Sequence, residues 1–349
     1  ACSASRAAYI GTHSALIARG IIYRLHFIDF RPCEDGLRLL ALRLCASSGA
    51  TRMLLISQLR LPIDHAEDAL RFAVLRALQI RDGELISLVI DQRAIDARRG
   101  CVEFSYSVLA TVKDEADVLR KADPKRVRVA PDDSYRELEG VTVSSGKHPR
   151  VIIVGTGPSG LMAGLLLARY GWKPVLLARG KAAGDRARDV TGFWRRHWEF
   201  NANSNVQFGE GGAGTFSDGK LYTQIRDREN RIPWVLKELV KAGAPEDILV
   251  NNRPHIGTDR LIKVVRTIRE EIISLGGEVR FESHVTDATV ENGVMKSVTL
   301  ASGEVIEGDA FVLAIGHSAR DTFKALHRRG VPFERKPFAI GVRIEHPQG

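Results

Sequence analysis

The chain has 349 residues, a hydrophobic content of 44% and a formal net charge of +9 at neutral pH. This length is enough for two or three domains, and no apolar stretch reaches the roughly 18–20 uninterrupted residues of a membrane span. The four cysteines show neither CxxC nor zinc-ligand spacing, so we expect no disulfide framework, no metal site and a cytoplasmic protein. The mild basic excess lacks interleaved aromatics, so it fits a phosphate-rich cofactor better than nucleic acid.

Residues 1–52 have no clear amphipathic period and contain three of the four cysteines. The first methionine is Met53, and the sequence becomes orderly there. We therefore expect residues 1–52 to be a non-native or disordered leader and Met53 to be the natural start. An organelle-targeting segment is the alternative, given the arginine and serine content.

Residues 53–122 predict a small α+β domain of ferredoxin-like type, because strands and helices alternate in the order β-α-β-β-α. The expected elements are strands at 53–60, 84–91 and 101–112 and helices at 65–79 and 114–121. Asp64 is the expected N-cap of the first helix. Residues 123–149 are rich in proline and charge and end near Ser-Ser-Gly, which predicts a linker.

An α/β domain is expected over residues 150–325, beginning with a short apolar strand of the kind buried in parallel sheets. The expected elements are strands at 151–154, 174–178, 278–284 and 310–315, helices at 158–170 and 257–275, and a meander at 287–291, 294–300 and 303–307. Asn292-Gly293 is a typical hairpin turn within the meander. The order predicts a Rossmann-like fold, a βαβ unit with a three-stranded meander. Residues 326–349 would begin a second, substrate-side domain.

The segment Gly155-Thr-Gly-Pro-Ser-Gly160 lies between the first strand and the first helix of this domain. Gly155 permits the sharp turn, Gly157 lets the backbone approach a pyrophosphate, and Gly160 allows close helix–strand packing. Pro158 suits a first helical position, and the amides from Ser159 onward present positive potential to phosphates. The strand–loop–helix context predicts a dinucleotide-binding loop.

The second strand of such a unit usually ends in an acid that accepts hydrogen bonds from the ribose hydroxyls. That position is occupied by Ala178, followed by Arg179. The ribose acid is therefore absent, and Arg179 is a candidate to contact a phosphate, as in an NADP site.

A second glycine-rich segment runs from Gly209 to Lys220 and contains five glycines within eleven residues. Ordering such a run on folding costs a large conformational entropy. Such a cost is expected where the backbone must bend unusually or contact a ligand. We expect an ordered ligand-binding loop, with a flexible surface loop as the alternative. Its candidate ligand-binding residues are Gly211, Gly212, Gly214, Thr215 and Ser217, and Lys220 is a candidate catalytic residue.

The last strand of the domain ends at Gly316, which we expect close to the cofactor, and His317 follows it. The carboxyl end of a parallel strand is where open α/β sheets bind ligands, so His317 is a candidate proton donor. The alternative is purely structural, with Ser318 capping a helix over 319–328 and Asp321 completing a capping box.

From Met53 to Gly349 the chain resembles a largely uncharacterised bacterial family of FAD-dependent dehydrogenases, which are NAD(P)/FAD-dependent oxidoreductases with two dinucleotide-binding folds. The residues that carry the resemblance are Ser204–Gln224, Ala242–Pro245, Pro254–Thr258, Gly316–Thr322 and Lys336–Pro347. The resemblance implies FAD as cofactor, a small α+β domain before the FAD-binding domain, and a chain that continues beyond Gly349. Members usually carry Glu where this chain has Ala178.

An FAD-dependent oxidoreductase is the leading functional hypothesis, with hydride exchanged between the flavin and an organic small molecule or NAD(P)H. One alternative is a flavin- or nucleotide-sensing protein without turnover, which the loss of an acid at Ala178 favours. Another is an RNA-modifying flavoprotein, which the absence of an aromatic–basic RNA signature disfavours.

Overall fold

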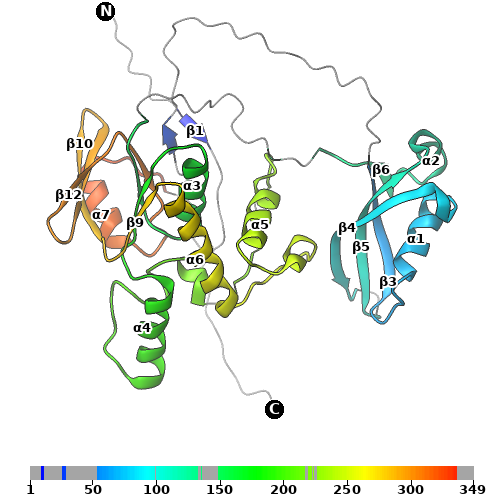
Figure 1. The fold of residues 1–349 in the computed structure, drawn as a ribbon, viewed down its shortest axis with the longest axis horizontal. Helices are drawn as coiled ribbons and strands as arrows, with labels where there is room; N and C mark the ends of the chain where they lie inside the picture. Colours follow the sequence, from blue (N-terminus) through cyan, green and yellow to red (C-terminus); the bar gives the residue numbers. More distant parts are fainter. Residues whose placement is uncertain are drawn as a thin grey trace, which may run out of the picture.

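The computed structural model describes residues 9–11, 26–28, 53–98, 100–132, 135, 148–216, 219–221, 223 and 226–335 (Figure 1). Within the expected leader, the short strands β1 (Tyr9–Gly11) and β2 (His26–Ile28) pair antiparallel. The rest of that leader, including three of the cysteines, lies outside the described residues. Cys101 is exposed and has no disulfide partner within the described part of the chain.

A four-stranded antiparallel sheet, in the order β4-β5-β3-β6, forms the first group of elements. Its elements are β3 (Leu54–Pro62), α1 (Ala69–Leu78), η1 (Asp82–Glu84), β4 (Leu85–Asp96), β5 (Glu103–Val112), α2 (Glu115–Lys121) and β6 (Val127–Val129). Every second side chain of β5, beginning with Tyr106, is buried, as the alternation in the sequence predicts. These residues join Val74 and Leu78 of α1 in one core.

Two predictions for this sheet were wrong in detail. The helix α1 begins at Ala69, later than expected, and its N-cap residue is Asp68 rather than Asp64. The sheet also extends into the expected linker, because β6 pairs with the first three residues of β3, Leu54–Ile56. By contrast, the Asp114 carboxylate caps α2, accepting the Asp117 amide at 2.9 Å.

The second group of elements contains a parallel sheet in the order β13-β7-β8-β9. Its strands are β7 (Val151–Val154), β8 (Val175–Leu177), β9 (Glu278–Arg280) and β13 (Ala310–Leu313). The helical segments are α3 (Pro158–Arg169), α4 (Ala183–Arg196), η2 (Ala213–Phe216), α5 (Arg231–Lys241), η3 (Glu246–Leu249), α6 (Thr258–Ser274) and α7 (Arg320–Arg328). The expected βαβ unit is therefore present as β7, α3 and β8. Strand β9 ends before the expected residue 284, and Glu282 then adopts a positive φ of 52°.

An antiparallel meander follows, formed by β10 (Val285–Glu291), β11 (Val294–Leu300) and β12 (Val305–Glu307). Asn292 and Gly293 both have positive φ, 51° and 77°. That geometry suits a two-residue hairpin turn, so the prediction from Asn-Gly is confirmed.

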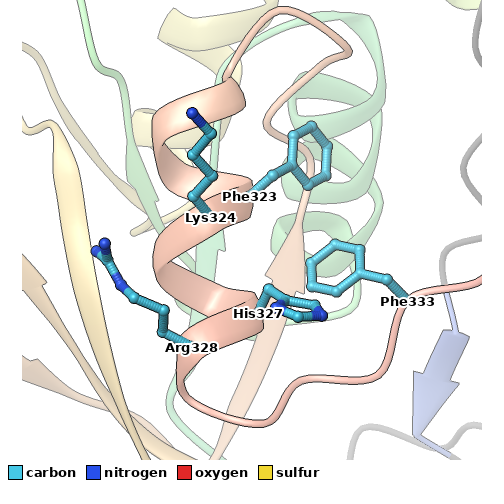
Figure 2. Close-up of a pocket in the computed structure, with 5 residues that line it drawn as sticks. All are labelled: Phe323, Lys324, His327, Arg328 and Phe333. Atoms are coloured by element: carbon cyan, nitrogen blue, oxygen red, sulfur yellow. The ribbon is translucent and has the colours of Figure 1, made fainter.

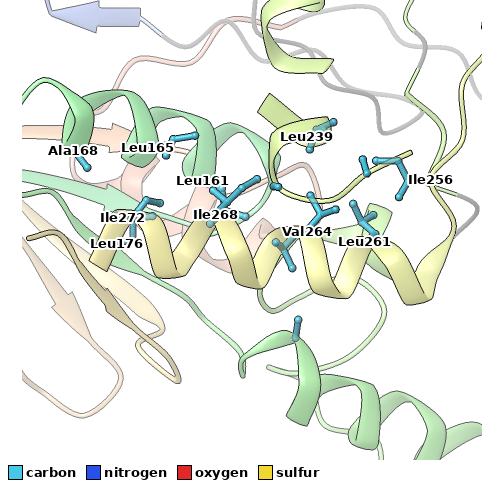
Figure 3. Close-up of a cluster of buried hydrophobic side chains, with 14 of the residues drawn as sticks. Leu161, Leu165, Ala168, Leu176, Leu239, Ile256, Leu261, Val264, Ile268 and Ile272 are labelled. Atoms are coloured by element: carbon cyan, nitrogen blue, oxygen red, sulfur yellow. The ribbon is translucent and has the colours of Figure 1, made fainter. Parts of the chain in front are cut away.

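Strand β7 is buried on both faces, which explains its uninterrupted apolar sequence. On one face, Ile153 contacts a cluster built mainly by α3 and α6, whose apolar side chains interleave along their length (Figure 3). On the other face, Ile152 and Val154 contact the meander and Leu326 of α7. Fully burying one such side chain contributes about 1.5–3 kcal/mol, so these two layers fix the strand end from which the first glycine loop leaves. No helix in the described part of the chain is both long and apolar enough to cross a bilayer.

Candidate functional site

The two glycine-rich segments, far apart in sequence, meet at the carboxyl end of β7. The Gly211 amide donates to the Thr156 carbonyl at 2.8 Å. A Cβ added to Gly212 would lie 3.2 Å from the Gly157 Cα, so the two backbones are in direct contact. The carboxyl edge of a parallel sheet is where α/β folds bind ligands. Two motifs that the sequence suggested separately therefore lie side by side at this edge of the sheet.

The three glycines of the first loop have different reasons to be glycine. Gly155 has a φ of +109°, and an added Cβ would lie 2.3 Å from the Ala314 carbonyl oxygen. An added Cβ on Gly160 would lie 1.9 Å from the Gly155 oxygen. Gly157 has an ordinary φ of −71°, and apart from its chain neighbours the only described atom within 4 Å of an added Cβ is the Gly212 Cα, at 3.8 Å. The fold therefore requires glycine at 155 and 160 but not at 157.

A buried arginine holds the second glycine segment from below. Arg186 of α4 is fully buried. Its guanidinium donates to the carbonyls of Glu210 at 2.6 Å, Asn205 at 2.7 Å and Val206 at 3.0 Å. It also lies 4.7 Å from the ring centroid of Phe216. Burial lowers the pKa of Arg186 to about 10, so the side chain remains charged at neutral pH.

Glu210 connects this segment to two helices. Its fully buried carboxylate accepts the Ala183 amide at 2.7 Å, at the start of α4, and Arg269 Nη1 of α6 at 2.9 Å. Burial raises the pKa of Glu210, whereas the Ala183 amide and the nearby arginines act in the opposite direction. Because both helices are tied to one carboxylate, Glu210 determines where the segment lies against the sheet.

The predicted donors of the second segment are used within the protein. The Gly211 amide donates to Thr156, that of Gly212 to Gly209, and that of Thr215 to Gly212. The Thr215 hydroxyl is buried and lies 3.5 Å from the Glu210 carbonyl. These residues shape the wall of the site rather than offering those groups to a ligand. Among the other candidates, Gly214 lies in η2, and Ser217 lies outside the described residues.

Arg179, at the end of β8, is held by three neighbours. Its Nη1 bonds to Asp321 Oδ1 at 2.9 Å, its Nε donates to Asn203 Oδ1 at 2.8 Å, and its guanidinium lies 4.1 Å from the centroid of the Phe208 ring. The ion pair offsets the charge that a phosphate contact would require. Ala178 is 1% exposed, and its amide and carbonyl are bonded to Arg280 and Ser283.

His317 lies at the carboxyl end of β13, at the same edge of the sheet, and follows Gly316, whose φ is +71°. Its Nε2 is 3.2 Å from the Ser318 hydroxyl, which donates to Gln207 Oε1 at 3.1 Å. The predicted capping box is wrong: the N-cap residue of α7 is Ala319, with no side-chain cap, and Asp321 bonds to Arg179 instead. The structural alternative for His317 thus loses its proposed basis.

Lys220 is exposed and forms an isolated antiparallel bridge with His255. The neighbouring Leu221 amide donates to Pro254 and the Ile256 amide to Gly219, at 3.0 and 3.2 Å. The end of the second glycine segment is therefore bonded to the residues that lead into α6.

A shallow hollow of about 430 Å³ lies on α7, lined by Phe323, Lys324, His327, Arg328 and Phe333 (Figure 2). Phe323 and Phe333 meet edge to face, with centroids 5.7 Å apart. None of these residues belongs to either glycine segment. Among the described residues, no cluster of His, Cys, Asp and Glu could hold a metal ion.

Two family models match parts of the chain. Residues 53–111 match a domain of unknown function (DUF8436), and residues 148–191 match an FAD binding domain. The second match contains β7, the first glycine loop, α3 and β8. It supports the prediction of an FAD-binding domain at this point of the chain.

An uncharacterized protein of Clostridium beijerinckii is 42% identical over 295 residues, which is 84% of this chain and 54% of the relative. The chain thus spans about half the length of the curated relative it matches. Among solved structures, Thermovibrio ammonificans THI4 has 20% identity and a TM-score of 0.32, covering 52% of this chain and 62% of the other. Glycine oxidase from Bacillus cereus has 14% identity and a TM-score of 0.28, covering 52% and 59%.

Proposed function

We propose that the chain binds FAD on its first glycine loop and is the nucleotide-binding part of a flavin-dependent oxidoreductase. In this Rossmann-like arrangement the diphosphate would lie against Gly157 at the N-terminus of α3, where amides and the helix dipole favour negative charge. The bound flavin would supply hydride transfer to or from an organic substrate or NAD(P)H. We also propose a ferredoxin-like fold for the small domain, which the sheet order β4-β5-β3-β6 supports.

The observation that carries the proposal is the unexplained glycine at 157. Its φ is ordinary and an added methyl group meets only a van der Waals contact at 3.8 Å, so the fold alone has no need of glycine there. A pyrophosphate approaching the backbone would need that space. The match of residues 148–191 to an FAD binding domain gives independent support.

Gly157→Ala tests this directly. We expect the variant to fold with an unchanged melting temperature but to bind FAD at least tenfold more weakly, measured by quenching of flavin fluorescence. Gly83→Ala is the matched control, because Gly83 lies in η1 of the small domain and an added Cβ there meets no described atom within 4 Å. If wild type binds no FAD, or if Gly157→Ala binds it as well as wild type, the proposal is wrong.

The proposed chemistry has its own test. His317 stands at the site edge with its ring beside the Ser318 hydroxyl, an arrangement that could hold or move a proton there. Bleaching of the bound flavin by NADH or NADPH under anaerobic conditions would support an oxidoreductase. A protein that binds FAD tightly but is never reduced would instead be a flavin-binding sensor.

A further inference from the structure

We infer that Asp321 supplies the ribose-binding carboxylate that position 178 lacks, accepting hydrogen bonds from the vicinal hydroxyls of the adenosine end of the bound dinucleotide. The inference rests on the proposed nucleotide-binding function. It assigns a specificity role to a residue far from Ala178 in sequence.

The sheet topology brings Asp321 to the required edge. Strands β13 and β8 flank β7 on either side. Asp321 lies in the first turn of α7, which follows β13, and Arg179 is the second residue after the end of β8. Their ion pair, 2.9 Å long, therefore spans the carboxyl end of β7, where the first glycine loop begins. A dinucleotide on that loop would meet Asp321 beside the strand end that usually carries the ribose acid.

The carboxylate is held in place and keeps capacity to accept further bonds. Oδ1 takes both hydrogen bonds from the protein, from Arg179 and from the Thr322 amide at 2.9 Å. Oδ2 lies 3.4 Å from Nε2 of His284, a contact without hydrogen-bond geometry, and the Asp321 side chain is 49% exposed. An ionised carboxylate accepts about four bonds, so a diol can be bound without displacing Arg179.

The charge state suits a diol and opposes a phosphate. Burial acts to raise the pKa of Asp321, but the bonds from Arg179 and the Thr322 amide outweigh it and hold the pKa below its usual value. Burial and the charge of Arg179 lower the pKa of His284, so that ring is neutral near pH 7. The neutral His284 provides no positive charge, and the charge of Arg179 is balanced by its ion pair with Asp321. The site therefore has no net positive charge to bind a phosphate on the ribose.

The test compares ADP with 2′-deoxy-ADP as ligands of the full chain, by isothermal titration. Charge-assisted bonds contribute about 1.5–3 kcal/mol, so wild type should prefer ADP by tenfold or more. Asp321→Asn keeps an acceptor for Arg179 but should lose most of this preference, because it weakens ADP binding more than the binding of 2′-deoxy-ADP, which has only the 3′ hydroxyl left to donate. Adding Ala178→Glu to that variant should restore the preference. Asp185→Asn, an exposed acid on α4, is the control.

Several outcomes overturn the inference. The inference is wrong if wild type shows no preference for ADP over 2′-deoxy-ADP, a result that does not depend on whether Asp321→Asn folds. It is also wrong if a folded Asp321→Asn protein keeps the preference. If FAD still binds wild type in either case, the proposed function stands and only the role of Asp321 falls. If the protein prefers ADP through Asp321 but binds no FAD, the ribose-binding role of Asp321 stands and the proposed FAD binding is refuted. If wild type binds neither ADP nor FAD, both the role of Asp321 and the proposed function are refuted.

Discussion

His284 is a residue whose surroundings disfavour its charged form. Burial and the charge of Arg179 lower its pKa, and its Nε2 is buried without a hydrogen-bond partner among the described residues. As pH falls through about 6.5, His284 becomes protonated in the unfolded chain but not yet in the folded chain. The free energy of unfolding therefore decreases as pH falls from about 6.5 to the lower pKa that His284 has in the folded protein. We therefore expect wild type to lose more stability than His284→Gln between pH 7.5 and 5.5, measured by urea unfolding. His327→Gln, an exposed control, should follow wild type; equal losses in all three would contradict the prediction.

Glu210 is the residue on which the second glycine segment depends. In Glu210→Gln the amide could still accept from Ala183, but Arg269 would lose its buried counter-ion. Removing one partner of a buried pair costs roughly 3–5 kcal/mol, and we expect a loss of about 3 kcal/mol in urea unfolding. FAD affinity should fall as well, because Gly212 would no longer be held against Gly157. Glu246→Gln, exposed on η3, should change neither quantity. A stable variant with normal FAD binding would show that Arg186 alone positions the segment.

At the scale of elements, the meander is fastened to α7 by an ion pair. Arg329 Nε donates to Asp287 Oδ1 at 2.8 Å, and Nη2 also contacts Oδ2. These bonds, with the Ala288 amide, lower the pKa of Asp287 to about 2. A depressed acid pKa means that the stabilisation is present above about pH 4 and lost as pH falls through about 2.

Asp287→Asn should therefore be less stable than wild type at pH 7. The pair is partly exposed and screened by solvent, so we expect only about 0.5–1 kcal/mol. The difference should shrink between pH 4 and pH 3 in urea unfolding, while Glu291→Gln, at the exposed end of β10, serves as control. A difference that stays constant with pH would mean that the asparagine disturbs packing rather than an ion pair.

Elements defined by local patterns were predictable, and those defined by distant contacts were not. The apolar run of β7 and the Asn292-Gly293 turn each have a local signature that the structure reproduces. Strand β6 exists because it pairs with β3, which no feature of its three residues announces. The predicted Ser318 cap failed because the hydroxyl is satisfied by Gln207, more than one hundred residues away.

The candidate site divides in the same way. The two glycine segments were identifiable because glycine runs of this kind are costly without a function. The second segment is held by three charged residues, Glu210, Arg186 and Arg269. Their spacing in the sequence does not indicate this role, because they come together only when α4 and α6 pack against the segment. Asp321 was considered only as a helix cap, because its partner Arg179 lies in another βα unit of the sheet.

At the scale of the whole molecule, the small domain contacts the segment that leads into α6. Strand β4 lies at the edge of its sheet, and the Arg93 amide donates to the Val250 carbonyl at 2.7 Å. The Asn252 amide donates back to Arg93 at 3.0 Å, and Gln92 Nε2 donates to Asn252 Oδ1 at 2.8 Å. An edge strand with unpaired backbone groups is a natural place for such an added pairing.

This contact continues toward the candidate site. Residues 254–256, just beyond it, pair with residues 219–221, at the end of the second glycine segment. The two domains are thus connected by backbone hydrogen bonds as well as by the chain that joins them. The side chain of Arg93 adds a specific bond, from Nη2 to Asn251 Oδ1 at 3.0 Å.

A double-mutant cycle on Arg93 and Asn251 tests whether this contact holds the domains together in solution. A hydrogen bond to a charged group contributes about 1.5–3 kcal/mol when buried, and this one is part-buried, so we expect a coupling of about 1 kcal/mol. The double variant should then lose about 1 kcal/mol less stability in urea unfolding than the sum of the two single losses. Each single loss also includes a separate contact, of Arg93 with the Phe104 ring and of Asn251 with Asp247. Arg71→Ala with Asn251→Ala is the control pair, since Arg71 bonds to Asp82 inside the small domain, and its effects should add. Additive losses in the Arg93 cycle as well would mean that the two side chains do not interact in solution and that the small domain is attached through backbone pairing or the connecting chain alone.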